Sequence, residues 1–141
     1  MTIASILQGR AEVVSVAPGT RVGDVVRLLA ERRIGAVPVV EEGRVLGVFS
    51  ERDVITGLAE SGAATLDRSV EEVMTSPAVT VRPSDSVVAA LALITRRRVR
   101  HLPVVEGETM VGLVSIGDLV KFRIDRIEAD AAAMRDYIQQ A

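Results

Sequence analysis

The sequence contains no cysteine and no tryptophan, and it has one histidine, one tyrosine and two phenylalanines. Without cysteine the chain can form no disulfide, no thiolate nucleophile and no zinc–thiolate site. One histidine alone cannot build a histidine-rich metal site. We therefore expect neither a metalloprotein nor an enzyme that depends on these groups. Because aromatic residues are so few, any bound base should lie mainly between aliphatic side chains.

The chain also lacks an excess of positive charge, a long apolar run and the basic start of a signal peptide. Its net charge is −2, which argues against nucleic acid as a partner because phosphate neutralisation dominates that affinity. The longest apolar run, 87–94, is well below the roughly 18 residues that a membrane span needs. The N-terminus has neither the basic region nor the apolar core of a secretory signal. We expect a soluble, cytoplasmic protein.

The sequence repeats itself at a fixed offset. When it is shifted by 65 residues, 14 of the 42 pairs aligned between 14–55 and 79–120 are identical. The identical pairs include Pro38/Pro103, Gly47/Gly112, Ser50/Ser115 and Asp53/Asp118. A solvated charge pattern would not return with its proline, glycine, serine and aspartate in step. The chain is therefore an internal duplication.

Each copy predicts the same order of elements, β-α-β-β-α. A short β-rich segment (13–16 or 79–81) is followed by apolar residues at helical spacing. Two strands joined by a turn come next, and a second helix begins near Ser50 or Ser115. One copy has too little core to be stable alone. We therefore predict an α/β (α+β) fold in which the two units pack as a pseudo-symmetric pair.

Short helices are expected to lead into each copy. Ser69 and Glu72 have the spacing of a capping box, which predicts a helix before the second copy. The N-terminal segment TIASIL is its counterpart, two residues further from its strand. We divide the chain into repeat 1 (1–60), a linker (61–68), repeat 2 (69–125) and a C-terminal helical extension (126–141).

The C-terminal residues predict one long helix, from Ile116 to Gln140. Its apolar residues follow a heptad seam at Val120, Ile124, Ile127, Ala131, Met134 and Ile138. The first two turns should cover the core of their own domain. Little core remains beyond them, so we expect a partner helix to cover the rest of the seam.

The repeated Ser-x-x-Asp motif, Ser50–Asp53 and Ser115–Asp118, carries the ligand hypothesis. A strand that ends in serine and continues into a helix presents free backbone N–H groups, which suit a phosphate. The aspartate would repel phosphate but suits a ribose diol. The same spacing is also a helix-capping signature, and the motif alone favours capping. Both interpretations stay open, and the residues around the motif have to decide between them.

A cluster of basic residues precedes the strand of the second copy. Arg96, Arg97 and Arg98 fall at the end of the predicted helix, where cations complement the helix dipole. The first copy repeats two of them as Arg32 and Arg33, which favours a structural role.

Arg100 and His101 begin a strand instead of ending a helix, and the first copy has Gly35 and Ala36 at these positions. They are candidates for a phosphate clamp. From its spacing alone, His101 is better explained as a neutral interior histidine that has satisfied its hydrogen bonds.

The tandem units resemble a pair of CBS domains (named from cystathionine β-synthase), also called a Bateman module. The likeness rests on the repeated order apolar-Pro-Val-Val, turn, Gly-apolar-apolar-Ser-x-x-Asp and helix, and it covers residues 2–124. It implies two related clefts for an adenine nucleotide (AMP, ADP, ATP, NAD(H) or S-adenosylmethionine) in a disc-shaped homodimer. CBS pairs usually regulate an enzyme, channel or transporter. The resemblance therefore implies a regulatory module with a client protein and no catalytic cofactor.

The resemblance also implies the ligand contacts. The motif serine and aspartate would hold phosphate and ribose, and residues of the first strands would lie near the adenine. Residues just before the strand proline would add phosphate contacts, strongly in the second copy and weakly in the first, where Arg52 could substitute. The predicted ligand-binding residues are Ser15, Ala36, Val37, Pro38, Ser50, Arg52, Asp53, Thr80, Arg100, His101, Leu102, Pro103, Ser115 and Asp118.

Several functions remain open at this point. The leading hypothesis is an adenine-nucleotide-binding regulatory module whose second-copy cleft, with Arg100 and His101, binds phosphorylated ligands more tightly. The alternative is a structural or protein-interaction domain whose motifs only cap helices. Nucleic-acid binding through 95–101 would show steep salt dependence. An enzyme is least favoured, because no nucleophile, catalytic base or metal cluster converges in the sequence.

Overall fold

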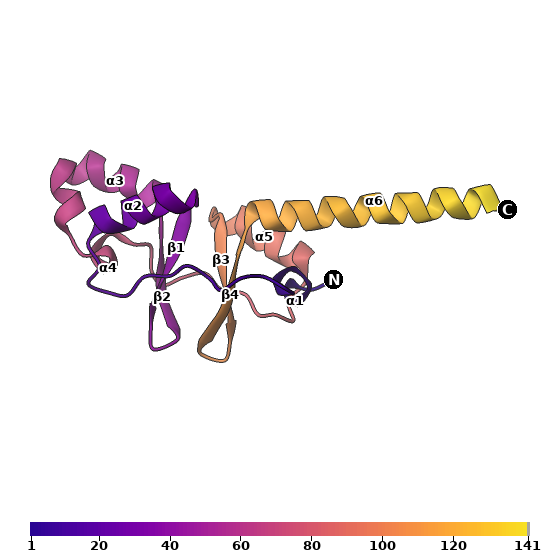
Figure 1. The fold of residues 1–141 in the computed structure, drawn as a ribbon, viewed down its shortest axis with the longest axis horizontal. Helices are drawn as coiled ribbons and strands as arrows, with labels where there is room; N and C mark the ends of the chain where they lie inside the picture. The colour runs from indigo at the N-terminus through magenta and orange to yellow at the C-terminus, as the bar shows by residue number, and fades with distance from the viewer. Residues whose placement is uncertain (141) are drawn as a thin grey trace.

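The computed structural model describes residues 1–140 as two similar units joined side by side (Figure 1). The first unit comprises α2 (Val22–Arg32), β1 (Ala36–Glu41), β2 (Arg44–Ser50), α3 (Glu51–Ser61) and the 3-10 helix η1 (Gly62–Asp67). The second comprises α5 (Val87–Arg97), β3 (His101–Glu106), β4 (Thr109–Ser115) and α6 (Ile116–Gln140). The short helices α1 (Ile3–Leu7) and α4 (Val70–Val73) lead into them. The mixed α/β class and the duplication are confirmed.

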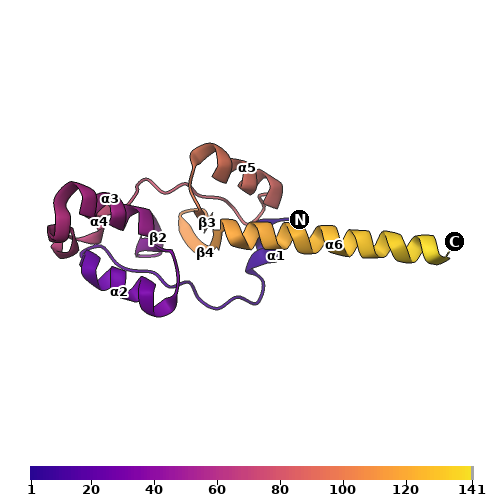
Figure 2. The same cartoon turned by 90° about the horizontal axis from the view of Figure 1, so that it is seen from above.

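The two β-hairpins, β1–β2 and β3–β4, have matching registers. Both are antiparallel, and each has an irregularity at the same place, between Val39 and Val40 and between Val104 and Val105. Figure 1 shows the hairpins next to each other with their turns on one side and the longer helices on the other. Figure 2 shows α2 and α3 at one end of the body and α5 and α6 at the other. The duplication therefore extends to backbone detail.

Polar contacts join the turns of the two hairpins. The Met110 N–H donates to the Gly43 carbonyl at 2.8 Å, and Arg44 forms an ion pair with Glu108. The units are thus in direct contact along their hairpins as well as through the chain that connects them.

The first β segment of each unit is shorter than the sequence predicted. Val16 alone pairs, as a parallel bridge to Val39, and Val81 bridges to Val104 in the same way. The first segment leaves the sheet at once because the backbone turns at Pro18. Proline favours the second position of a turn and has no N–H to donate to a ladder.

Each unit has its own hydrophobic core, and each lead helix belongs to the core of the other unit. Ile3 and Ile6 of α1 pack with Leu102 and Leu119 in the second core. Val70 of α4 is completely buried in the first core. A chain segment that precedes one unit therefore completes the other.

Both lead helices are confirmed, but the predicted capping box of α4 is not formed. The Ser69 side chain makes no capping hydrogen bond. The Glu72 carboxylate accepts a hydrogen bond from Arg68 at 3.1 Å instead, so it is not used to cap the helix.

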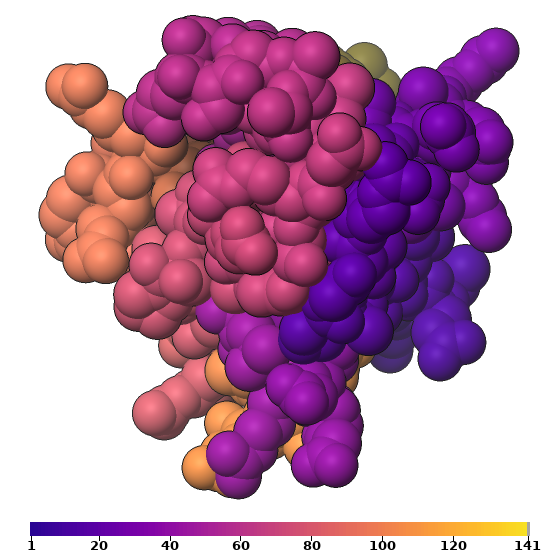
Figure 3. Space-filling model, turned by 90° about the vertical axis from the view of Figure 1, so that its left-hand side faces the viewer, coloured from indigo at the N-terminus to yellow at the C-terminus, as the bar shows by residue number. Residues whose placement is uncertain are grey.

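The end of the first unit is closed by α3, η1 and α2, which lie against each other in Figure 3. Thr65 of η1 is completely buried and its hydroxyl donates to the Gly57 carbonyl at 2.7 Å. A Cβ at Gly57 would lie 2.5 Å from the Thr65 methyl group. Glycine therefore permits the close approach of η1 to α3.

The long C-terminal helix, α6, is confirmed with the predicted bounds. Leu119 is completely buried and Phe122 packs against the second core. The helix then continues away from the body (Figure 1), and its apolar residues are exposed. Ile127 is 52% exposed and Ile138 is 64% exposed. Val120 and Ile124 are exposed as well, so the first turns cover the core with Leu119 and Phe122 instead of with the seam. Within residues 1–140, the distal part of the seam therefore has no partner.

The lead segments cross the hairpins at Gly47 and Gly112. We predict that replacing these glycines by alanine destabilises the fold to different extents. A Cβ at Gly47 would lie 2.7 Å from the Thr75 carbonyl oxygen, whereas one at Gly112 would lie 2.7 Å from a Leu7 methyl. The backbone cannot move as easily as the end of a leucine side chain. Gly47→Ala should therefore lower the free energy of unfolding by about 1–3 kcal/mol, and Gly112→Ala by less. Urea denaturation followed by circular dichroism measures both; equal losses would contradict the prediction.

Candidate functional site

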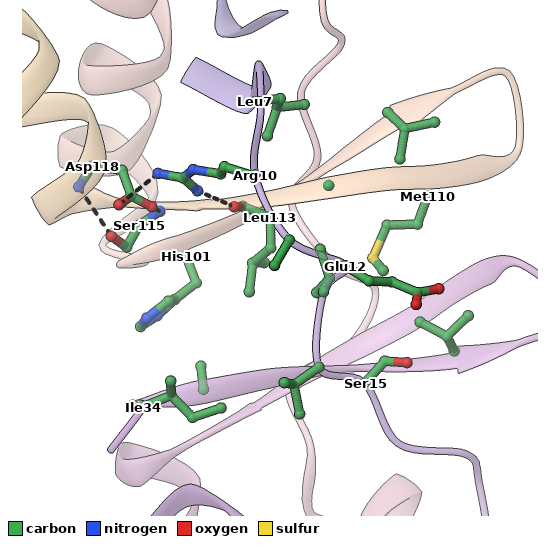
Figure 4. Close-up of a pocket in the computed structure, with 18 residues that line it drawn as sticks. Leu7, Arg10, Glu12, Ser15, Ile34, His101, Met110, Leu113, Ser115 and Asp118 are labelled. Atoms are coloured by element: carbon green, nitrogen blue, oxygen red, sulfur yellow. Dashed lines mark hydrogen bonds and ion pairs between the residues drawn. The ribbon is translucent and has the colours of Figure 1, made fainter. Parts of the chain in front are cut away.

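A cavity of about 770 Å³ opens between the two units (Figure 4). Its volume is in the range of pockets that hold small ligands. Five of the residues predicted from the sequence line it: Ser15, Ala36, His101, Ser115 and Asp118.

The two walls of the cavity come from different repeats. The segments 13–15 and 34–36 of the first repeat form one wall, and 110–113 of β4 with Asp118 of α6 form the other. The side chains of Val13, Val14 and Ile34 provide the aliphatic surface that the sequence led us to expect around a base. A ligand here would therefore touch both repeats.

The Ser-x-x-Asp motif at this cavity forms a reciprocal cap on α6. The Asp118 N–H donates to Ser115 Oγ at 3.0 Å, and the Ser115 N–H donates to Asp118 Oδ2 at 2.8 Å. Ser50 and Asp53 form the same box on α3, with the Ser50 N–H 2.9 Å from Asp53 Oδ2. The capping interpretation is thus confirmed. Each box leaves the other carboxylate oxygen, Oδ1, to a different partner.

Those partners come from the lead segments. Arg10, which follows α1, places Nη2 2.8 Å from Asp118 Oδ1 and Nη1 3.1 Å from the Leu113 carbonyl oxygen (Figure 4). In the first repeat, the Thr75 hydroxyl donates to Asp53 Oδ1 at 2.9 Å. Neither Arg10 nor Thr75 was among the residues predicted from the sequence. No sequence motif identifies either residue, although they occupy matching positions at the 65-residue offset.

The charges in the cavity follow from these contacts. Burial on its own raises the pKa of Asp118, but the hydrogen bonds from Arg10 and Ser115 and the charge of Arg10 outweigh it, so the pKa is lowered. The carboxylate is therefore ionised at neutral pH.

His101 has a lowered pKa. Burial is the main cause, the charge of Arg100 adds to it, and the charges of Asp118 and Glu51 partly oppose it. Because the ordinary value is about 6.5, the imidazole is neutral at pH 7. The sequence interpretation of a neutral interior histidine agrees in the charge of the ring, but His101 is only partly buried.

Four of the other predicted residues belong to the hairpins. Val37 and Leu102 are completely buried in the two cores, so their side chains face away from any ligand. Pro38 and Pro103 are also buried, one position further along β1 and β3. Any ligand contact at these positions would have to come from the backbone.

The last five predicted residues do not line this cavity: Ser50, Arg52, Asp53, Thr80 and Arg100. Arg52 donates to the Arg98 carbonyl oxygen at 3.3 Å, and the side chains of Thr80 and Arg100 are exposed. The hypothesis from the sequence placed Arg100 beside Asp118. The structure instead brings Asp118 together with Gly35 and Ala36 of the other copy.

The cavity offers groups that suit a nucleotide. An ionised carboxylate can accept hydrogen bonds from a ribose diol, and a guanidinium and a helix N-terminus can donate to a phosphate. Within residues 1–140, no three acidic or histidine side chains come together as metal ligands. No helix in that range is long and apolar enough to cross a membrane.

Known proteins with similar sequences share this architecture. The chain is 32% identical over 121 residues to the mitochondrial CBS domain-containing protein CBSX3 of Arabidopsis thaliana, covering 82% of this chain and 59% of that protein. The chain thus spans about three fifths of that relative's length.

Solved structures match the fold more completely. The CBS-domain protein ATU1752 of Agrobacterium tumefaciens superposes with a TM-score of 0.82 at 36% identity, over 87% of this chain and 99% of that one. CBSX2, solved in complex with AMP, superposes with a TM-score of 0.77 at 26% identity, over 88% of this chain and 96% of that one. Residues 5–60 and 70–125 each match the CBS domain family. The chain therefore belongs to the CBS-domain family, and it carries two copies of the domain in tandem.

Proposed function

We propose that the protein is a regulatory module that binds an adenine nucleotide and signals its occupancy to a partner protein. The observation that carries the proposal is the composite cavity, in which Ser115 and Asp118 at the start of α6 face Ser15 and Ala36 of the first repeat. The complex of CBSX2 with AMP supports it, because that structure has the same fold.

The bound nucleotide would lie across the cavity. Its ribose would meet Oδ1 of Asp118, the oxygen that the capping box does not use and that contacts Arg10 in the free protein. Its phosphate would lie at the N-terminus of α6 near the Ser115 hydroxyl. Its base would lie by Ser15, against the aliphatic side chains of the first-repeat wall. No catalytic group is assigned in this proposal, and the ligand is released unchanged.

The internal symmetry supports a second cleft. Moving Ser15, Gly35 and Ala36 forward by 65 residues gives Thr80, Arg100 and His101, and moving Asp118 back by 65 gives Asp53. We therefore assign Thr80, Arg100, Ser50 and Asp53 to this second cleft, with Arg52 at its edge. Arg100 would act as its phosphate ligand. This assignment exchanges the partners that the hypothesis from the sequence gave to the two aspartates.

The route from ligand to partner would run through α6. Asp118 lies in the first turn of this helix, and the distal seam is exposed. A second copy of the chain would cover the seam in a cytoplasmic homodimer, and a client enzyme or transporter would respond to it.

A structural or interaction domain without a physiological ligand is the second candidate. The complete capping boxes on α3 and α6 favour it, because they explain both Ser-x-x-Asp motifs without a nucleotide. The two candidates differ in their response to nucleotides.

We predict that AMP stabilises the fold against heat. A ligand at about 100 times its dissociation constant adds about 2.7 kcal/mol per site, which raises Tm by about 5–10 °C for a chain of this size. Asp118→Asn should reduce the shift because it weakens the ribose contact. Asp130→Asn, which changes an exposed carboxylate further along the same helix, should leave the shift intact. No response to millimolar AMP, ADP, ATP, NAD(H) or S-adenosylmethionine would favour the second candidate.

We predict that AMP raises the pKa of His101 and that adenosine does not. A phosphate dianion near the ring favours the protonated imidazolium, so the midpoint should move to higher pH. His101 is the only histidine, which makes its NMR titration unambiguous. In the free protein, Asp118→Asn should lower the same pKa because it removes a negative charge that raises it. Equal shifts with AMP and adenosine would mean that the phosphate lies out of reach of His101.

We predict that the distal part of α6 holds the dimer together. Truncation after Asp125 should give a monomer while both repeats stay folded, because it removes the four seam residues furthest from the body, Ile127, Ala131, Met134 and Ile138. Ile127→Glu with Met134→Glu should do the same, whereas Ala133→Glu, outside the seam, should leave the dimer intact. Light scattering measures the masses. An unchanged mass on truncation would place the dimer contact elsewhere.

A further inference from the structure

The cavity that holds Asp118 has one permanent positive charge. Among the residues that line it, Arg10 is the only arginine and there is no lysine. His101 has a lowered pKa and is neutral at pH 7, and the acidic residues Glu12 and Asp118 would repel a phosphate. Gly35 occupies the position at which the second copy has an arginine. Among the lining residues, Arg10 is therefore the one permanently charged cation that a phosphate can meet.

Arg10 is already inside the site in the free protein. Its guanidinium bridges Asp118 Oδ1 at 2.8 Å and the Leu113 carbonyl oxygen at 3.1 Å. Figure 4 shows it next to Ser115, at the end of α6 where a phosphate would lie. The side chains of Arg10 and Asp118 are 36% and 31% exposed. About a third of each side chain is open to solvent, so a ligand that enters the cavity can reach the pair.

The two lead segments differ in length just before Arg10. Thr2 bridges to Ser86 and Ser69 bridges to Arg21 in equivalent contacts. Thr2 and Ser69 are 67 positions apart instead of 65, so the first lead segment has two extra residues.

The two extra residues form a turn just before Arg10, which matches Thr75 at the 65-residue offset. The Arg10 N–H donates to the Leu7 carbonyl at 3.2 Å, and Gly9 between them has a φ of +71°, which suits glycine. The second lead segment instead offers the uncharged Thr75 hydroxyl to Asp53. The arginine is thus specific to one of the two clefts.

We propose that Arg10 is the phosphate-recognition residue of the Asp118 cavity. In the free protein, its guanidinium occupies the carboxylate oxygen that the ribose needs. When a nucleotide binds, the guanidinium moves to the phosphate, and Asp118 Oδ1 accepts a ribose hydroxyl. This inference rests on the proposed function and deepens it, because it makes the cavity selective for phosphorylated adenosine.

Adenosine is the informative comparison. It must displace Arg10 from Asp118 but offers no phosphate in return. Removing the guanidinium therefore weakens AMP binding, while adenosine binding stays the same or becomes tighter. An arginine that only held the cavity in shape would weaken both ligands together.

The experiment is a calorimetric titration of AMP and adenosine into Arg10→Gln and its parent, both in an Asp53→Asn background that weakens the other cleft. One charge-assisted hydrogen bond to phosphate corresponds to about tenfold or more in affinity. We expect Arg10→Gln to lower the AMP affinity by at least about tenfold and to leave the adenosine affinity equal or higher. Arg10→Lys should retain part of the preference for AMP. Arg27→Gln, which removes the same charge from an exposed pair with Asp24, should change neither ligand.

The outcomes separate the inference from the proposed function. Equal losses of AMP and adenosine affinity in Arg10→Gln, or an unchanged ratio of the two, would overturn the role of Arg10 while nucleotide binding stands. A loss of the AMP preference in Arg10→Lys as large as in Arg10→Gln would also contradict it. If the parent protein binds neither AMP nor adenosine, the proposed function itself fails, and the role of Arg10 fails with it.

Discussion

The packing of each lead helix into the opposite repeat is the constraint on which the rest of the structure depends. Ile3 and Ile6 of α1 complete the second core, and Val70 of α4 completes the first. Neither repeat can bury its apolar surface alone, so the two must fold together. The same crossing carries Arg10 to Asp118 and Thr75 to Asp53. The path of the two lead segments therefore determines both the packing of the cores and the contacts of the two aspartates.

A cavity built at such a crossing is necessarily composite. One wall comes from the first repeat and the other from the second, so a bound molecule would bridge them and bias their relative position. Asp118 is part of the wall and also of the first turn of α6. A ligand that changed the partners of the Asp118 carboxylate would therefore act directly on the helix that leaves the body. Under the proposed function, this would be a short route from the bound ligand to a partner protein.

The sequence predicted the local elements well, because they depend on neighbours along the chain. Periodicity and turn residues predicted both hairpins, α2, α5 and the bounds of α6 at Ile116 and Gln140. The duplication predicted that the elements of the two copies would correspond. The sequence overestimated the length of the first strands, because a β-rich segment can form either a full strand or a single bridge such as that of Val16. The sequence could not predict which motif residues share a cleft, since that depends on how the two repeats face each other. Arg10 belongs to no motif, and contacts in space alone identify it.

The two clefts differ less in charge than the sequence suggests. Compared position by position, the first copy lacks the arginine of the second, with Gly35 in place of Arg100. In the folded chain, the cavity that includes Gly35 receives Arg10 from the longer of the two lead segments. The cleft that symmetry assigns to Asp53 has Arg100 and the neutral Thr75. On this assignment each cleft has its own guanidinium, supplied from a different part of the chain. In the Asp118 cavity, that guanidinium is paired with a carboxylate at the start of α6, which would bind the ribose under the proposed function. The two copies would then keep one guanidinium per cleft, and the Asp118 cleft would be the one that directly contacts the C-terminal helix.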